Sequence, residues 1–106
     1  MKVRYLFREE NQADDMTIGG GYVVLGIEAD SYRILNDENR SYLYNPKQFS
    51  IVDAAEPEFW VNEYGEDGER YAYPQAWLKP GFFEDYHDDV EVAKKLFWSV
   101  HRTYYG

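Results

Sequence analysis

The first half of the chain is divided into short runs in which apolar and polar residues alternate. Residues 2–7 show the pattern clearly, with Val3, Tyr5 and Phe7 at every second position. A period of two residues places such side chains on one face of a β-strand. The same pattern predicts five strands in all, at residues 2–7, 22–28, 31–35, 42–44 and around Phe49 and Ile51.

Loop and turn signals separate these predicted strands. Residues 8–18 are polar and aperiodic, which predicts a long loop. Residues 36–39 predict a turn because Asn and Asp tolerate left-handed backbone geometry, and residues 45–48 predict one helical turn. Gly26 interrupts the second strand and predicts a β-bulge or a sharp twist there. We expect three side chains of that strand to share one face, those of Val23, Leu25 and Ile27.

This order of strand, long loop, three-strand meander, tight turn and strand resembles the SH3-like barrel. The resemblance covers about residues 1–53, and it rests on the order of the elements and on Pro46-x-x-Phe49. It implies a small five-stranded barrel. The side chains expected to share its core are Val3, Leu25, Ile34, Phe49 and Ile51.

The second half predicts a β-hairpin followed by a helix. Residues 54–87 contain two apolar-rich runs on either side of Asp67-Gly68, a dipeptide typical of hairpin turns, and then an aromatic loop. A helix follows at 88–105, where Asp88 and Glu91 have the spacing of a capping box. Its apolar stripe, expected to pack on the barrel, is Val90, Ala93, Phe97, Val100 and Tyr104. The fold class is therefore mainly β with a C-terminal α-helix, in one domain over residues 1–106.

The net charge of −9 restricts the classes of partner. A negative field repels phosphate and anionic lipid, so we expect neither nucleic acid nor a membrane as partner. The same field favours a basic protein, although it would also serve solubility alone. Charged residues interrupt the apolar run at the N-terminus, and no segment approaches the ~18 apolar residues of a membrane span. The expected location is the cytoplasm.

No group of residues has the pattern of a catalytic or metal centre. There is no cysteine, and residues 84–89, the densest polar segment, are adjacent in sequence and so seldom converge on one ion. Acid–base chemistry by His87 with Asp85 or Glu84 would lack a nucleophile in a strained turn. We therefore expect no enzyme activity, no metal and no cofactor, and we interpret His87 as a surface histidine beside carboxylates.

Aromatic residues gather in the segment after the predicted barrel. Two interpretations of this set are open: the rings form the core that joins hairpin, loop and helix, or some of them stay exposed as contact anchors. Trp60 and Trp77 are the strongest anchor candidates because tryptophan is enriched at binding hot spots. The set is Phe59, Trp60, Tyr64, Tyr71, Tyr73, Trp77, Phe82, Phe83 and Tyr86.

A small acidic chain with many Tyr and Trp residues resembles the immunity proteins that neutralise bacterial toxins. The resemblance implies a non-catalytic, bacterial inhibitor that masks a basic, nuclease-like site on a toxin. The alternative is an adaptor or a phage or bacterial accessory protein whose barrel docks a peptide or subunit. Beside Trp60 and Trp77, the expected contact residues are Glu66, Asp67 and Glu69 at the hairpin tip and Glu84, Asp85, Asp88 and Asp89 before the helix.

Overall fold

The alternating runs of the sequence form the strands of an antiparallel sheet. The computed structural model describes residues 1–106, and it is mainly β with a C-terminal helix, as predicted. The strands are β1 (Lys2–Tyr5), β2 (Gly21–Glu28), β3 (Ser31–Leu35), β4 (Ser41–Tyr44), β5 (Phe49–Asp53), β6 (Val61–Tyr64) and β7 (Arg70–Tyr73). The helical elements are the 3-10 turns η1 (Pro46–Gln48) and η2 (Gln75–Trp77), and the helices α1 (Phe82–His87) and α2 (Glu91–Tyr104).

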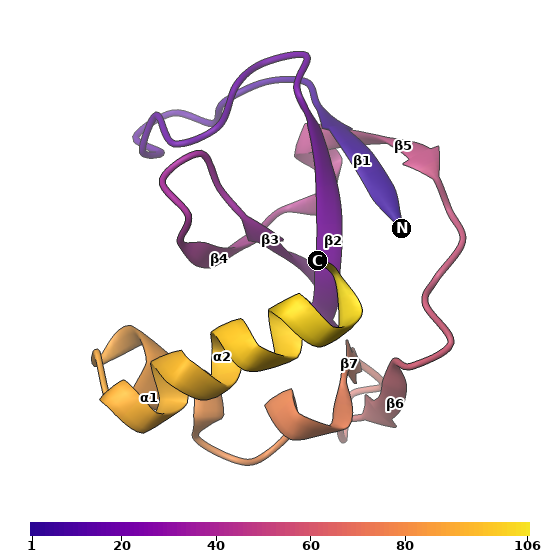
Figure 1. Cartoon of the computed structure of the whole chain (residues 1–106). Helices are drawn as coiled ribbons and strands as arrows, with labels where there is room; N and C mark the ends of the chain where they lie inside the picture. Colours follow the sequence, from indigo (N-terminus) through magenta and orange to yellow (C-terminus); the bar gives the residue numbers. More distant parts are fainter.

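The sheet is branched and open. Its main path runs β4-β3-β2-β1-β5, and the β6–β7 hairpin joins it because β7 pairs with the C-terminal end of β2 (Figure 1). No ladder joins β4 to β5, so strand pairing does not close the sheet into a barrel. The hairpin is therefore part of the sheet and not an extension beside it.

A bulge in β2 turns successive side chains to opposite sides of the sheet. The register between β2 and β3 shifts between Val24 and Gly26, which confirms the irregularity predicted at Gly26. Val24 and Leu25 are 0% and 1% exposed, and they belong to two different cores. A Cβ on Gly26 would lie 2.1 Å from the ring of Tyr73, so the glycine lets this ring lie directly on the β2 backbone.

Two hydrophobic cores lie on either side of this strand. The first comprises Val3, Tyr5, Met16, Val24, Ile27, Tyr32, Ile34, Tyr44, Phe49, Trp60 and Ala72. The second comprises Leu25, Tyr73, Trp77, Phe82, Phe83, Tyr86, Ala93, Phe97 and Val100.

The single core expected of the first half is therefore wrong in two positions. Leu25 lies in the second core because the bulge reverses its direction, so Val23 is exposed and does not share a face with it. Ile51 is 55% exposed and lies on β5, the edge strand at one end of the main path of the sheet. Phe7 lies beyond the end of β1 and is also exposed.

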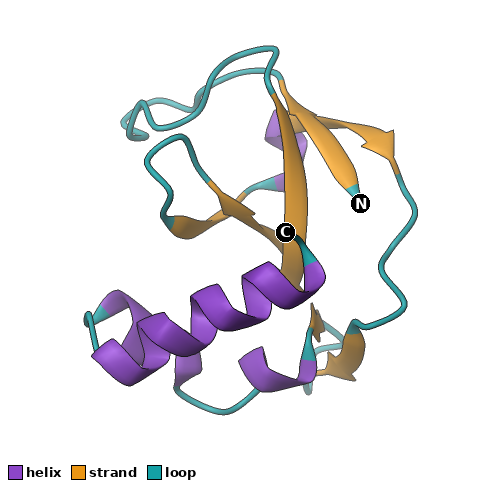
Figure 2. Cartoon of the chain, viewed as in Figure 1, coloured by secondary structure: helices purple, strands orange, loops and turns teal.

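The helical elements of the second half lie together against one side of the strands (Figure 2). α1 was not predicted, and α2 begins at Glu91 and not at Asp88. The predicted capping box is wrong because Asp88 ends α1, its N–H donating to the Glu84 carbonyl, and Val90 precedes α2 without a side-chain cap. Within the predicted stripe, Ala93, Phe97 and Val100 are buried, whereas Val90 and Tyr104 are exposed.

The long loop between β1 and β2 is fixed to the turn between β3 and β4. The Asp37 carboxylate accepts hydrogen bonds from Thr17 Oγ1 at 2.6 Å and from Tyr22 Oη at 2.7 Å. These hydrogen bonds lower the pKa of Asp37 because they favour its charged form.

Neither α1 nor α2 has the length and apolar character that a membrane-crossing helix requires.

Candidate functional site

The seven carboxylates expected at the contact surface lie in three separate places. Glu66, Asp67 and Glu69 occupy the turn between β6 and β7, Glu84 and Asp85 lie on α1, and Asp88 and Asp89 form the turn between α1 and α2. Six of them are exposed, and the Glu69 side chain folds over Gly65 and is half-buried. Only Asp89 forms an ion pair, with Lys94 at 3.3 Å. The structure therefore brings only part of the predicted set into any one site.

Trp60 and Trp77 are core residues. They are 6% and 2% exposed, so almost no ring surface is accessible to a partner. Trp60 Nε1 donates to Tyr105 Oη at 2.9 Å, and Tyr105 Oη donates in turn to the Leu25 carbonyl at 2.6 Å. Trp77 stacks on Phe97 with ring centroids 4.9 Å apart. For these two residues the structure selects the first of the two interpretations of the aromatic segment.

The β6–β7 hairpin and α1 are separated by a groove of about 250 Å³. Buried and half-buried rings form its floor, and three carboxylates and one ammonium group surround them. We call this feature the acidic groove. It is lined by Glu28, Glu63, Tyr71, Tyr73, Trp77, Leu78, Lys79, Pro80, Gly81, Phe82, Phe83 and Glu84.

Of the carboxylates around the acidic groove, only Glu84 was predicted. Glu63 points out of β6 and Glu28 lies at the end of β2, two strands that β7 brings together. This convergence depends on pairing between residues more than 40 positions apart, such as Glu28 with Tyr71. The charge of Glu63 is consistent with its exposure, but no local signal places it beside Glu84.

A buried arginine lies beneath the acidic groove. Arg33 is 2% exposed, and its Nε donates to Tyr73 Oη at 3.0 Å while its Nη2 pairs with Glu28 Oε1 at 3.2 Å. Its Cζ lies 3.8 Å from the centroid of the Phe83 ring, a cation–π contact. Within β3, Arg33 lies on the opposite side from its neighbours Tyr32 and Ile34, which belong to the first core. The packing of α1 over that side buries it.

The same guanidinium reaches His87 on its other side. Arg33 Nη1 lies 3.2 Å from His87 Nε2, and because a guanidinium can only donate, Nε2 is the acceptor. Burial and the Arg33 charge both lower the pKa of His87, so its neutral form is favoured. In this arrangement the Nε2 lone pair accepts a hydrogen bond from Arg33.

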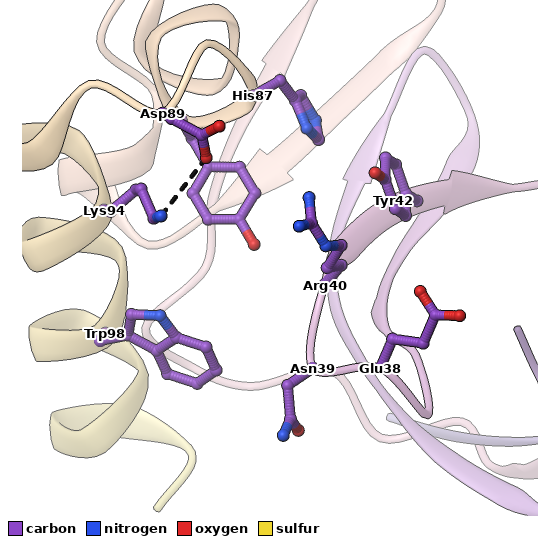
Figure 3. A pocket seen from close by; sticks show the side chains of 9 residues that line it. Glu38, Asn39, Arg40, Tyr42, His87, Asp89, Lys94 and Trp98 are labelled. Atoms are coloured by element: carbon purple, nitrogen blue, oxygen red, sulfur yellow. Dashed lines mark hydrogen bonds and ion pairs between the residues drawn. The ribbon is translucent and has the colours of Figure 1, made fainter.

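A second cavity, of about 210 Å³, lies between α2 and the turn that follows β3. Figure 3 shows Lys94 and Trp98 of α2 facing Arg40 and Tyr42 across it, with the Lys94–Asp89 ion pair at one side. The His87 ring stacks on Tyr42 with centroids 5.3 Å apart. The lining is Glu38, Asn39, Arg40, Tyr42, Tyr86, His87, Asp89, Lys94 and Trp98, in which two carboxylates balance two cations.

The two hollows thus differ in charge. The second cavity has no dominant sign of charge and contains an internal ion pair, whereas the acidic groove carries unpaired carboxylates around an aromatic floor.

The structure brings together no three His, Asp or Glu residues in a group suited to a metal ion. Comparisons with protein-family models, with curated proteins and with solved structures find no match to this chain.

Proposed function

We propose that this chain is a non-catalytic protein-binding domain that masks a basic site on a partner, as an inhibitor of the immunity type does. The observation that supports the proposal is the set of seven predicted carboxylates on the second half, six of which are exposed and of which Asp89 alone has an ion-pair partner. A carboxylate without an internal partner is free to pair with a cation of another protein. Such groups also steer a basic partner into contact.

The fixed position of the acidic segments also supports binding. Phe82, Phe83 and Tyr86 anchor α1 in the second core, and Tyr73 anchors the hairpin in the same core. The carboxylates therefore project from elements whose inner faces are packed, so less conformational entropy is lost when a partner binds. A protein as partner, without nucleic acid or membrane, is part of this proposal and rests on the net charge of −9. A location in the cytoplasm is also part of the proposal.

The proposal requires a salt-dependent association with a basic protein. The tagged chain is used to isolate its partner from the source cells, and surface plasmon resonance of the purified pair is measured from 50 to 500 mM salt. We expect one basic protein whose association rate falls by about tenfold or more across the series, because salt screens steering. Dissociation should change little, since rim charges act mainly on encounter.

Charge reversal at the hairpin tip tests the surface itself. Glu66→Lys with Asp67→Lys should slow association further without unfolding the domain, because both side chains are exposed. The matched control is Glu10→Lys with Asp14→Lys, the same change of charge at exposed positions of the long loop. Equal effects of both double variants, or an association rate independent of salt, would contradict the proposal and leave solubility as the role of the charge. A large assembly in place of one partner would indicate the adaptor function.

A further inference from the structure

We infer that the acidic groove accepts one arginine side chain of the basic partner. This inference rests on the proposed function, and it adds the chemical group that the partner inserts. The groove measures about 250 Å³. That volume is below the range of about 300–1,000 Å³ usual for pockets that hold a whole small ligand. A single protruding side chain suits it better than a helix or a complete cofactor.

The walls of the groove suit a planar cation. Its lining includes the half-buried ring of Tyr71, whose face attracts a cation through its quadrupole, beside the largely buried rings of Phe82 and Phe83. Glu63 and Glu84 are exposed, lie on opposite sides of the groove, and have no ion-pair partner. Carboxylates on two sides of an aromatic floor can receive the several N–H donors of a guanidinium, which an ammonium group cannot present in a plane.

Beside the groove, the protein already holds a guanidinium with groups of the same kinds, an aromatic ring and a carboxylate. Arg33 stacks on Phe83 at 3.8 Å and bonds to Glu28 and to the Tyr73 hydroxyl, and all three of these partners also line the groove. Because Glu28 pairs with the buried Arg33, the charge balance of the groove is set by the remaining groups. Glu63 and Glu84 together outweigh Lys79, so an entering cation meets a net negative site.

Nuclear magnetic resonance of the three tryptophan indole groups can locate the bound side chain. Trp77 lines the acidic groove, Trp98 lines the second cavity, and Trp60 lies in neither, with its Nε1 bonded to Tyr105. The probe is the tripeptide acetyl-Gly-Arg-Gly-amide, titrated into the full chain labelled with ¹⁵N. The same peptide with citrulline, a neutral analogue of arginine, and with lysine serve as controls. We expect the arginine peptide to shift the Trp77 signal and to leave those of Trp60 and Trp98 in place.

Paired variants separate the groove from the general charge of the protein. Glu63→Gln with Glu84→Gln should weaken binding of the arginine peptide about three- to tenfold, the effect of removing two partly exposed ion pairs. Glu66→Gln with Asp67→Asn removes the same charge from the hairpin tip and should change the dissociation constant less than about twofold. Preserved indole spectra in both variants would show that the fold is intact.

Several results would overturn the inference. These are no shift of Trp77 with the arginine peptide, an equal shift with citrulline or lysine, or equal weakening by both double variants. Each would leave the proposed function standing if the partner still associates in a salt-dependent manner and the Glu66 and Asp67 reversals still slow it. Conversely, arginine binding in the groove without any basic partner would sustain the site and reject the inhibitor role.

Discussion

The two cores of this protein differ in amino-acid composition. The first lies among strands and mixes Val, Ile, Met and Ala with five rings, whereas six of the nine residues in the second are aromatic. Rings of the second core contact one another in series, as Trp77 does with both Phe97 and Phe83. Large flat side chains leave a large void when one is removed. The second core, which supports the acidic groove, therefore depends more on each single side chain.

The largest effect is expected from a ring at the centre of the second core. Phe97 is 0% exposed, so Phe97→Ala should lower the free energy of unfolding by about 3–5 kcal/mol. Urea titration followed by tryptophan fluorescence measures this loss. The control is Leu96→Ala, at a neighbouring position that is 38% exposed, with an expected loss below ~1 kcal/mol. Equal losses for both variants would show that the helix does not pack as described.

A smaller effect is expected where the two cores meet. Gly26→Ala places a Cβ 2.1 Å from the Tyr73 ring and 2.8 Å from the Ala72 carbonyl oxygen, so β7 has to move away from β2. Overpacking of this kind costs about 1–3 kcal/mol. Gly21→Ala is the control because nothing lies within 4 Å of its added Cβ and it belongs to the same strand. Urea midpoints of the two variants that differ by less than the error would count against the close contact.

Removal of one methyl group from the first core should cost less. Ile34 is 0% exposed, and Ile34→Val should lower the free energy of unfolding by about 0.5–1.5 kcal/mol. Ile51→Val removes the same group from a side chain that is 55% exposed, and its effect should fall within about 0.5 kcal/mol of zero. Chemical denaturation of the two variants side by side tests the exposure of Ile51, which the sequence pattern placed in the core.

The smallest effect concerns pH. The pKa of His87 is lowered by burial and by Arg33, and that of His101 by burial, so the folded state binds fewer protons than the unfolded state near the ordinary value of 6.5. Stability should therefore fall as the pH drops through that region. Asp37 and Glu56 have lowered pKa values, and their contributions are lost only below the ordinary values of 3.8 and 4.5.

This pH dependence is measured by urea midpoints at pH 7.5 and 5.5. His87→Gln should reduce the decrease between the two, since it removes one of the groups that takes up a proton on unfolding. His87 also faces Glu28, Asp88 and Arg40, and the two carboxylates oppose the effect of the arginines. An unchanged decrease in the variant would mean that the protonation of His87 does not contribute to the pH dependence of stability.

Local features of this chain could be predicted from its sequence, and features made by distant contacts could not. Alternation located all five strands of the first half, and Asp67-Gly68 located the hairpin, because these signals act within a few residues. The direction of Leu25 depends on the bulge, so alternation assigned it wrongly, and the burial of Arg33 depends on a helix about 50 residues away, for which alternation gives no signal.

The candidate site shows the same division. The exposure of Glu66, Asp67 and Glu84 follows from their polarity and is observed. The acidic groove, however, exists because β7 pairs with β2 and brings Glu63 and Glu28 to the side of α1. The sequence carries these residues in three separate segments and contains no local pattern that joins them.

Gly26 limits whether the chain can be truncated, and whether its second half can be transferred to another protein. A chain shortened to end near residue 53 would expose Leu25 and the bare backbone where Tyr73 now lies. Residues 54–106, in turn, cannot be grafted onto an arbitrary five-stranded sheet. The receiving strand must have a glycine at the bulge and an apolar residue before it, or the ring of Tyr73 has no surface on which to pack.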